Sequence, residues 1–567
     1  MKEKIEKILQ GAIHQLYDNS HGREEHAIEI LIEVPKEKTY GDYATSVALV
    51  LAKKLGKNPV EVAREIISKI GKQKFIEKIE VAGPGFINFY LSQDFFIEKV
   101  KEILKNKKAK GSEHGRRIIV EYTDPNILKE FHIGHLMSNA IGESISRIFE
   151  FQGAKVKRAN YQGDVGLHVA KALWGKSKNP NMTWAQAYAF GSTKYEEDGV
   201  AKQEIIELNK KIFEKSDTSV NQLYAQGRKE SLVYFEKIYK KLGTHFDRLF
   251  FESEVAETGK KIVEGGLKKG IFEPGERGAI VFKGETVGLH TRVFINSEGL
   301  PTYEAKDLAL PELKYQYFKY DTSVIITAHE QNAYFDVMLA ALKELQPQLQ
   351  EKTKHIGHGM MRLPEGKMSS RTGKVVTAES LIEKVKEMVR EKAANKVLDD
   401  ATIEIIAIGA LKYSILKQSI GSDIIFDFEK SISFEGDSGP YLQYSYVRAI
   451  SVLAKAKVEK VKASLKKVPT EITQLEKMMS RFPEVIVTAA GGIPSEGGKK
   501  AGAEYEPHVI TLYLTELARE FNNYYAHHKI VDKEDEFSPY RVGLAKAFSI
   551  IIKNGLWLLG IQAPIKM

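Results

Sequence analysis

Two histidines and a glycine stand close together in the order His132-Ile-Gly134-His135. They follow an apolar run, residues 117–121, that predicts a buried strand, and they open a helical pattern over residues 134–151. The start of a helix favours phosphate, imidazoles donate hydrogen bonds to it, and a glycine leaves room for a flat base. The spacing predicts a nucleotide site at the carboxyl end of a parallel strand, although alone it also fits histidines with a purely structural role.

A second candidate segment is basic and rich in hydroxyl groups, and it follows the last predicted strand. It reads Gly366-Lys367-Met368-Ser369-Ser370-Arg371-Thr372-Gly373. A glycine-flanked loop with Lys367 and Arg371 suits a mobile clamp that neutralises charge on a triphosphate as pyrophosphate leaves. Solvated basic loops are common, so this prediction depends on both segments occurring together and in this order.

The elements that must position these residues form two halves of one predicted parallel sheet. Each half alternates strands with helices, as crossovers between parallel strands require. An insertion over about residues 165–295 separates the halves. The predicted elements are strand 117–121, helix 134–151, strand 156–161, helix 305–318, strand 323–327, helix 334–345 and strand 354–359.

Two further regions flank this sheet. Residues 1–110 predict an α+β unit, whereas residues 378–567 are almost entirely helical in period. The expected N-terminal elements are strand 27–34, helices 42–55 and 60–70, and two strands around Gly83-Pro84-Gly85. The expected C-terminal helices include 403–416, 441–454 and 508–525.

The composition limits the chemistry available to the chain. Its 567 residues are 43% hydrophobic and 28% charged, which suits several domains better than one binding module. Because cysteine is absent, disulfides, thiolate nucleophiles and cysteine-bound zinc are excluded. The net charge of +9 is compatible with a polyanionic partner without requiring one. No apolar run is long enough for a signal or membrane span, so we expect a cytoplasmic protein.

The motifs resemble those of the class I aminoacyl-tRNA synthetases, and more closely those of the arginyl members. The run from Glu121 to His135 matches their extended HIGH motif, and the segment from Gly366 to Gly373 matches their KMSKS motif. The resemblance covers essentially the whole chain. Further matches are Gly41-Asp-Tyr-Ala-Thr45, Ala82-Gly-Pro-Gly-Phe-Ile-Asn-Phe89, Pro440-Tyr-Leu-Gln-Tyr-Ser-Tyr-Val-Arg448 and the run from Gly555 to Met567.

This resemblance implies an α/β multidomain protein with a Rossmann-type parallel-sheet catalytic domain over residues 111–377. An N-terminal α+β additional domain that contacts tRNA would occupy residues 1–110, and an α-helical anticodon-binding domain would occupy residues 378–567. The implied enzyme activates L-arginine with ATP and transfers it to the 3′ end of tRNA(Arg). Magnesium would accompany ATP, no tightly bound cofactor or dedicated metal site is expected, and a monomer is usual in the family.

The resemblance also assigns the two nucleotide segments. The catalytic residues would be His132, His135, Lys367, Arg371 and Lys129. The ATP-binding residues would be His132, Gly134, His135, Lys367, Met368, Ser369 and Ser370.

The expected arginine pocket can also be argued from spacing. Tyr303 and Asp307 are four residues apart on a predicted helix, so their side chains share one face. A carboxylate there can take a guanidinium bidentately while the tyrosine packs against it or bonds to it. By resemblance, Glu121 assists at the guanidinium, and Asn126 and Gln331 hold the α-groups.

The expected RNA contacts lie at the two ends of the chain. Tyr441, Tyr444 and Arg448 share one helix face, which suits stacking with unpaired bases, although the rings could instead be core. By resemblance this face is the anticodon pocket, with Met567 close by. Phe86 and Asn88 match positions that touch the tRNA elbow.

Three positions depart from the family pattern. Ser370 stands where most class I enzymes have a second lysine, and we expect Lys129 to bring the missing charge to the phosphates. Asp124 replaces the usual serine and either binds the α-ammonium or faces solvent. His168 replaces a glutamine, so its direct contact with substrate is not expected.

Three alternative functions remain open from the sequence. A class I lysyl enzyme would share both nucleotide motifs, but would not be expected to have the additional domain or the Tyr303 and Asp307 pair. A catalytically silent tRNA-binding paralogue would usually lose part of the ATP site. A small-molecule nucleotidyltransferase would leave the long helical C-terminal region without a purpose.

Overall fold

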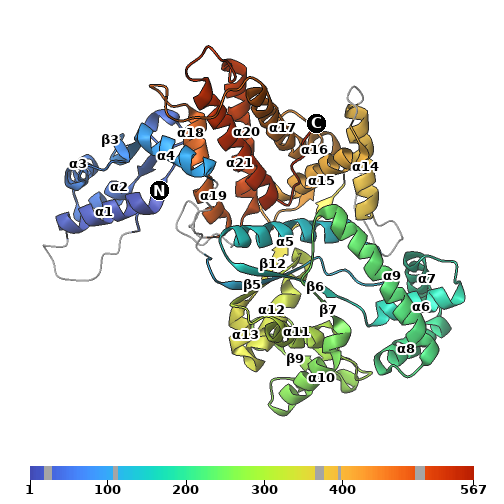
Figure 1. Ribbon diagram of the computed structural model, residues 1–567. Coiled ribbons are helices and arrows are strands. Elements are labelled where there is room, and N and C mark those ends of the chain that lie inside the picture. The colour runs from blue at the N-terminus through green and yellow to red at the C-terminus, as the bar shows by residue number, and fades with distance from the viewer. Residues whose placement is uncertain (18–28, 106–112, 364–375, 394–397, 492–504) are drawn as a thin grey trace.

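Three parts follow one another along the chain: an N-terminal α+β domain, a central α/β domain and a C-terminal helical domain (Figure 1). The computed structural model describes residues 1–17, 29–105, 113–363, 376–393, 398–491 and 505–567. The helical domain covers one side of the central domain, and the N-terminal domain projects sideways from it (Figure 1). Within the described ranges, no helix has the length and apolar character to span a membrane.

The N-terminal domain is built on a four-stranded antiparallel sheet in the order β1-β2-β4-β3. Helices cover it and enclose a separate core around Leu51, Ile66 and Phe89. The helix expected from residue 42 begins only at Val47, because Tyr43–Thr45 pairs with β4 as a strand. The elements are α1 (Lys2–Tyr17), β1 (Ile32–Glu33), β2 (Tyr43–Thr45), α2 (Val47–Leu55), α3 (Pro59–Lys69), β3 (Ile76–Ala82), β4 (Phe86–Leu91) and α4 (Gln93–Leu104).

The central domain contains a five-stranded parallel sheet in the order β12-β11-β5-β6-β7. Strands β5, β6, β11 and β12 and their crossover helices were predicted. Strand β7 was not, and it lies inside the expected insertion, so part of that insertion belongs to the sheet. The elements are β5 (Arg117–Tyr122), α5 (Ile133–Phe151), β6 (Lys155–Gln162), β7 (Arg248–Phe251), α11 (Tyr303–Tyr317), β11 (Thr322–Ala328), α12 (Asn332–Leu345), α13 (Pro347–Lys352) and β12 (Thr353–His358).

The rest of the insertion forms a helical lobe before β7 and a small antiparallel sheet after it. The lobe packs against the loop that precedes α5, since a Cβ at Gly227 would lie 2.6 Å from Leu128. The elements are α6 (Leu167–Lys178), α7 (Trp184–Glu197), α8 (Gly199–Glu214), α9 (Thr218–Leu242), α10 (Glu252–Lys268), β8 (Glu273–Pro274), β9 (Ile280–Phe282) and β10 (Arg292–Ile295).

The C-terminal domain is a helical bundle that shares one continuous core with the central domain. Helix α5 lies between the parallel sheet and the bundle (Figure 1), and it packs against α15, α20 and α21. The predicted C-terminal helices are present with slightly wider bounds. The elements are β13 (Met361–Arg362), α14 (Ala378–Lys392), α15 (Asp400–Leu416), β14 (Ile424–Ile425), α16 (Phe428–Ser431), α17 (Gly439–Val458), α18 (Gln474–Ser480), α19 (Phe482–Ala489), α20 (Pro507–His527) and α21 (Ser538–Leu558).

Hydrogen bonds join α5 to the last turn of α21. Ser144 Oγ donates to Leu558 O at 2.9 Å, and Arg147 Nη1 donates to Trp557 O at 2.9 Å. Lys412 of α15 donates to Gly560 O at 2.7 Å just beyond that turn. Carbonyl groups at a helix C-terminus have no partner within the helix, so these side chains satisfy them.

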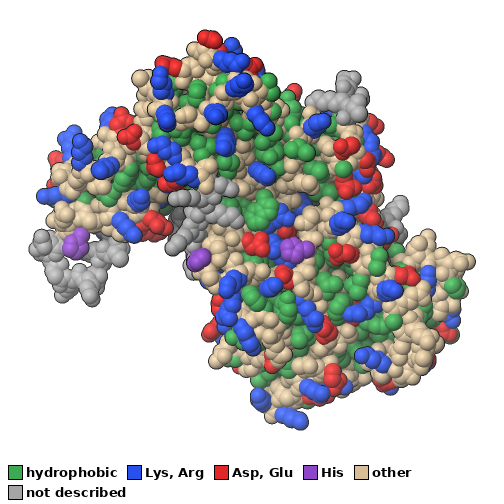
Figure 2. Space-filling model, in the orientation of Figure 1, with side chains coloured by type: hydrophobic (Ala, Val, Ile, Leu, Met, Phe, Trp, Pro, Cys, Tyr) green, Lys and Arg blue, Asp and Glu red, His purple; other side chains and the backbone are tan. Residues whose placement is uncertain are grey.

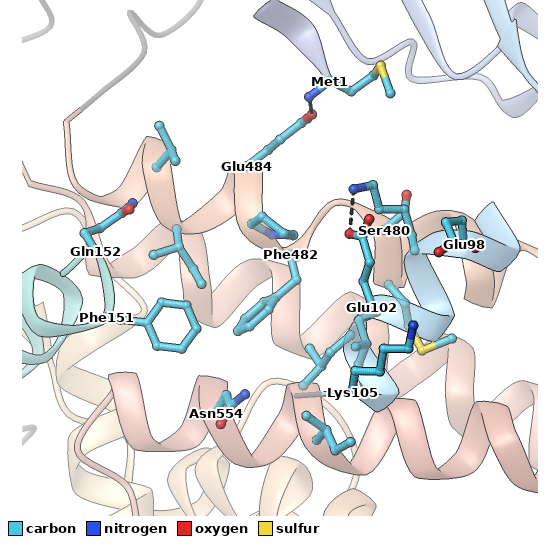
Figure 3. Close-up of a pocket in the computed structure, with 18 of the residues that line it drawn as sticks. Met1, Glu98, Glu102, Lys105, Phe151, Gln152, Ser480, Phe482, Glu484 and Asn554 are labelled. Carbon is cyan, nitrogen blue, oxygen red and sulfur yellow. Dashed lines mark hydrogen bonds and ion pairs between the residues drawn. The ribbon is translucent and has the colours of Figure 1, made fainter. Parts of the chain in front are cut away.

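A cavity of about 710 Å³ lies where the three domains meet. Figure 3 shows Glu102 of α4, Phe482 and Glu484 of the helical domain, and Phe151 at the end of α5 around it. Because α5 has 19 residues, its far end is about 28 Å from the histidines that open it. This cavity is therefore an interdomain space, separate from the nucleotide site that the sequence predicts.

Candidate active site

The loop between β5 and α5 has a strained backbone. Three non-glycine residues in it have positive φ: Thr123 at 84°, Asp124 at 45° and Leu128 at 63°. Neighbouring elements hold the loop in this conformation. The bonds that do so are Thr123 N to Ser138 Oγ at 2.9 Å, Ile127 N to Gly163 O at 3.0 Å, and Leu128 N to Ser231 Oγ at 2.9 Å.

His132 and His135 lie at the start of α5 with their rings stacked, the centroids 3.6 Å apart. His132 Nδ1 accepts a hydrogen bond from Gly134 N, and His135 Nδ1 accepts one from His132 N, both at 3.1 Å. Each neutral ring therefore carries its proton on Nε2. A Cβ at Gly134 would lie 3.0 Å from the His132 ring, so a side chain there would press on it. The arrangement can offer two N–H donors to phosphate oxygens.

The electrostatic environment keeps both rings neutral. Burial lowers the pKa of His132 to about 4, with a contribution from the charge of Lys129. Burial also lowers the pKa of His135 well below its ordinary value, with contributions from His132 and Lys129. The positive charge nearby belongs to Lys129, whose Nζ lies 4.4 Å from the centroid of the Tyr188 ring. The site therefore combines neutral donors with one lysine.

Tyr303 and Asp307 occupy the first turns of α11 and face the carboxyl edge of the sheet. Asp307 Oδ2 accepts a hydrogen bond from Tyr334 OH at 2.6 Å. Tyr303 is 50% exposed, and its hydroxyl lies 3.5 Å from His168 Nδ1. The Tyr161 hydroxyl is buried and has no hydrogen-bond partner among the described residues, and the charge of Asp307 acts on it. This pocket has room for hydrogen bonds to a ligand.

Two buried lysines balance part of the negative charge around the pocket. Lys314 Nζ donates to Glu121 Oε2 at 3.0 Å, and Lys306 pairs with Glu252. The Lys306 Nζ also lies 4.3 Å from the centroid of the Tyr303 ring. Glu121, expected to bind a guanidinium, therefore already has a buried cationic partner.

Three carboxyl groups of the pocket have raised pKa values, because they are buried and the positive charge beside them does not offset the cost of burial. Burial, together with the charges of Glu121 and Glu252, raises the pKa of Asp307 to about 7, although the hydrogen bond from Tyr334 lowers it. Burial raises the pKa of Glu252 to about 7 despite Lys306. Burial and Glu121 raise the pKa of Asp124 well above its usual range. A cationic ligand would supply the missing charge.

Asp124 and Asn126 lie on the strained loop and are both partly buried. Asp124 Oδ1 accepts a hydrogen bond from Tyr161 N at 2.7 Å, so this carboxylate is held against β6 and does not extend into solvent. A Cβ at Gly163 would lie 2.0 Å from Asn126 Oδ1, so only glycine at 163 leaves Asn126 in place. Gln331 is exposed just beyond β11, the strand beside β5.

Several pocket residues were not predicted from the sequence. Glu252 follows the unexpected strand β7, and its partner Lys306 is 54 residues away in the chain. Lys306 stands between Tyr303 and Asp307 on α11, so the i, i+3 and i+4 spacing could have included it. The other unpredicted residues are Tyr161, Lys314 and Tyr334.

The second basic segment lies outside the described residues. Lys367, Met368, Ser369, Ser370 and Arg371 all belong to the range 364–375. Their expected roles at ATP therefore stay predictions. The described chain that follows this range contacts the start of α5, because His132 forms a bridge with Thr377 and Ala378 N donates to Phe131 O at 2.8 Å.

Residues of the predicted RNA-binding face of α17 contact Asn522 of α20. Arg448 Nη1 donates to Asn522 Oδ1 at 2.6 Å, and Arg448 Nη2 donates to Tyr444 OH at 3.2 Å. Tyr441 is only 8% exposed and packs in the core, whereas Tyr444 and Arg448 are half-buried and Tyr525 is 44% exposed beside them. The face open to a base therefore comprises Tyr444, Arg448 and Tyr525.

The remaining predicted RNA contacts differ in exposure. Phe86 at the start of β4 is 36% exposed, whereas Asn88 on the same strand is 2% exposed. Met567 packs against the core of the helical domain. Lysine and arginine side chains are spread over the face in Figure 2 and do not gather in one patch. Charge alone therefore does not locate an RNA path.

Three family models match consecutive stretches of the chain. The model described as tRNA synthetases class I (R), catalytic domain, matches residues 99–428. The arginyl tRNA synthetase N terminal domain matches residues 3–91, and the DALR anticodon binding domain matches residues 442–567. Together they account for all three structural parts.

Similar proteins match this chain over nearly its whole length. The chain is 30% identical to an arginine–tRNA ligase of Halothermothrix orenii, over 100% of this chain and 99% of the relative. It is 32% identical to one of Lactobacillus delbrueckii subsp. bulgaricus, over 95% and 96% of the two chains.

Two solved structures share the fold over the whole length. The arginyl-tRNA synthetase of Plasmodium falciparum has a TM-score of 0.78 at 22% identity, covering 100% of this chain and 99% of its own. That of Thermus thermophilus has a TM-score of 0.73 at 22% identity, covering 100% of both chains.

Proposed function

The chain belongs to the arginyl-tRNA synthetase family, and from that premise we propose that it is an arginine–tRNA ligase acting on L-arginine, ATP and tRNA(Arg). The observation that carries the proposal is the shortage of positive charge around Asp307, Glu252 and Asp124, beside a helix that opens with two histidines. Arginine brings a guanidinium and an α-ammonium, so it fits this pocket by charge. Its carboxylate is the group that must reach ATP.

The reaction proceeds in two steps. The arginine carboxylate attacks the α-phosphorus of ATP, which gives arginyl-adenylate and pyrophosphate. The terminal ribose hydroxyl of tRNA then attacks the activated carbonyl and releases AMP. No covalent enzyme intermediate forms, so catalysis depends on positioning and on stabilising charge at the phosphates.

The pocket residues divide between the two ends of arginine. Asp307 takes the guanidinium, and the Tyr303 hydroxyl bonds to it, while Glu121 with Lys314 supports the negative potential behind them. Asn126 and Gln331 hold the α-groups. The same geometry would also admit lysine, so amino-acid specificity is the first property to test.

The nucleotide end uses the Nε2–H groups of His132 and His135 as donors to phosphate. Lys367 and Arg371 close over the triphosphate. No described cluster of three or more histidine or carboxylate side chains is arranged to hold a metal ion. Magnesium would therefore take its ligands from ATP oxygens and water.

tRNA binds along the helical and N-terminal domains. Tyr444 and Arg448 stack with and hold unpaired bases of the anticodon, and Phe86 contacts the tRNA elbow. The protein works in the cytoplasm as a monomer. Binding of tRNA precedes amino-acid activation, so exchange between ATP and pyrophosphate requires tRNA.

Charging of total tRNA with each labelled amino acid in turn tests the proposed function. Arginine alone should be transferred, and exchange with arginine should exceed exchange with lysine and glutamine by orders of magnitude. Preferential charging with lysine would identify a lysyl enzyme, and binding of tRNA without charging would identify a silent paralogue. Full-rate exchange without tRNA would contradict the proposed order of events.

Lys129→Ala tests whether this lysine supplies the positive charge that Ser370 does not. Loss of one charge that stabilises the transition state should lower the exchange rate about 100-fold. Lys178→Ala is the matched control, because its Nζ also lies over an aromatic ring, 5.1 Å from the centroid of Trp174. Unchanged exchange in Lys129→Ala would remove Lys129 from the catalytic set.

A further inference from the structure

The His168 ring lies buried beside the Tyr303 hydroxyl. It is 6% exposed, on the first turn of α6. Its Nε2 lies 3.1 Å from Gly163 O, and its Nδ1 lies 3.5 Å from the Tyr303 hydroxyl. One imidazole therefore connects the loop after β6 with the tyrosine of the arginine pocket.

The backbone fixes the tautomer of this ring. A carbonyl oxygen can only accept, so the contact with Gly163 O requires a proton on Nε2. Burial lowers the pKa of His168 to about 3, with Lys129 contributing, so the ring is neutral at working pH. A neutral imidazole with a proton on Nε2 has a lone pair on Nδ1. Nδ1 must then accept the hydrogen bond from the Tyr303 hydroxyl.

Because the Tyr303 hydroxyl donates to His168, it can only accept a hydrogen bond from a ligand. Its single proton points toward His168, so its lone pairs face the pocket. Lys306, 4.3 Å from the ring centroid, lies over the aromatic face and restricts rotation of the side chain. The hydroxyl is therefore an acceptor where the substrate's terminal group lies.

We propose that His168 is a positioning residue that makes the Tyr303 hydroxyl an obligatory acceptor, and that this selects a guanidinium over an uncharged urea group. The inference rests on the proposed function. Arginine offers N–H donors at all terminal positions of the guanidinium. Citrulline has a carbonyl oxygen at one of these positions, which would face the hydroxyl lone pairs without a proton between them.

Two conservative variants separate the two contacts of the ring. In His168→Asn the side-chain oxygen lies near the position of Nδ1, so the variant keeps the acceptor toward Tyr303 and loses the donor toward Gly163 O. In His168→Gln the amide lies near the position of Nε2, so the variant keeps that donor and loses the acceptor. Gly163 O also accepts a hydrogen bond from Ile127 N at 3.0 Å, which neither substitution removes. His245→Gln, an exposed histidine before β7, is the control.

Exchange between ATP and pyrophosphate is measured on the full chain with tRNA, with arginine and with citrulline. In His168→Gln, kcat/KM for arginine should fall about tenfold through KM, while the value for citrulline should not fall. His168→Asn and His245→Gln should stay within about twofold of the unsubstituted protein. Tyr303→Phe should lower the arginine value similarly, and adding His168→Gln to it should have no further effect.

The opposite pattern would overturn the inference. If His168→Asn is impaired and His168→Gln is not, the ring only supports the loop at Gly163. If the effects of His168→Gln and Tyr303→Phe add, His168 does not act through the hydroxyl. Failure of the unsubstituted protein to activate arginine would instead remove the proposed function and this inference with it.

Discussion

Two groups of buried carboxylates lie on opposite faces of the central sheet, and they differ in how much positive charge lies beside them. Glu121 and Tyr122 are neighbours on β5, so their side chains point to opposite faces. Tyr122 donates to Glu143 of α5 at 2.6 Å, whereas Glu121 faces Lys314 of α11. Tyr122 therefore belongs to a structural cluster, whereas its neighbour Glu121 belongs to the candidate substrate pocket.

The cluster under α5 is fully balanced. Glu143 is 1% exposed and pairs with Arg147 at 2.6 Å and with Arg158 at 3.0 Å. Although burial alone would raise its pKa, the two arginines and Tyr122 lower it to about 2. Arg158 also pairs with Glu150 at 2.7 Å. All these charges have partners within the fold, so this cluster needs no ligand.

In the pocket on the other face, the buried carboxyl groups outnumber their cationic partners, and this difference distinguishes a ligand site from a structural cluster. Asp307 has a tyrosine as its hydrogen-bond donor, not an arginine, and its pKa is raised to about 7. Burial is common to both clusters, so burial alone does not mark a site. The missing cation does, because a cationic ligand would then complete the cluster.

Glu143→Gln should have the largest effect on stability. Removing the charge leaves Arg147 and Arg158 buried with too little negative charge, at a cost of about 3–5 kcal/mol in the free energy of unfolding. Chemical denaturation measures it. Glu150→Gln is the control, because that carboxylate is 31% exposed and should matter less. A smaller loss in Glu143→Gln than in Glu150→Gln would contradict the comparison.

Asp307→Asn should have the reverse profile. The free energy of unfolding should not fall, because the variant removes an unbalanced buried carboxyl group. The kcat/KM for arginine in the exchange assay should fall about 100-fold, the effect of losing a charged partner in a desolvated pair. Loss of stability with full activity would place Asp307 in a structural cluster instead.

The raised pKa values predict a smaller, pH-dependent effect. Below about pH 7, Asp307 takes up a proton that arginine must displace, so KM for arginine should rise about tenfold from pH 8 to pH 6. Stability should change in the opposite direction. A folded pKa above the unfolded value of 3.8 stabilises the protein at low pH, and this contribution is lost as pH rises through about 7.

The protons released when arginine binds can be measured directly by calorimetry in buffers of different ionisation enthalpy. Asp307→Asn should release fewer protons on binding than the unsubstituted protein. Equal release would assign the titration to another group.

The sequence predicted those features that local spacing determines. The alternating strands and helices gave four of the five parallel strands, and the four-residue spacing of Tyr303 and Asp307 placed both on α11. Strand β7 was missed because its four residues lie between long helical patterns and show no clear period. Glu252 was missed with it.

The charge balance of the pocket could not be predicted, because it depends on tertiary contacts. Lys314 meets Glu121 across 193 residues of sequence, and Lys306 meets Glu252 across 54. Tyr441 illustrates the same limit, since helical spacing alone does not distinguish a core ring from one that faces RNA.

The bonds between α5 and the end of α21 have a consequence for how this protein can be divided. The carbonyls of Trp557, Leu558 and Gly560 are bonded to side chains of α5 and α15, and one core spans both domains. Excising the helical bundle would expose that core and remove the Trp557 and Leu558 carbonyls that accept hydrogen bonds from Arg147 and Ser144 of α5. The family models mark separate modules along the sequence, but the catalytic and helical domains share one buried core, so we expect them to unfold together.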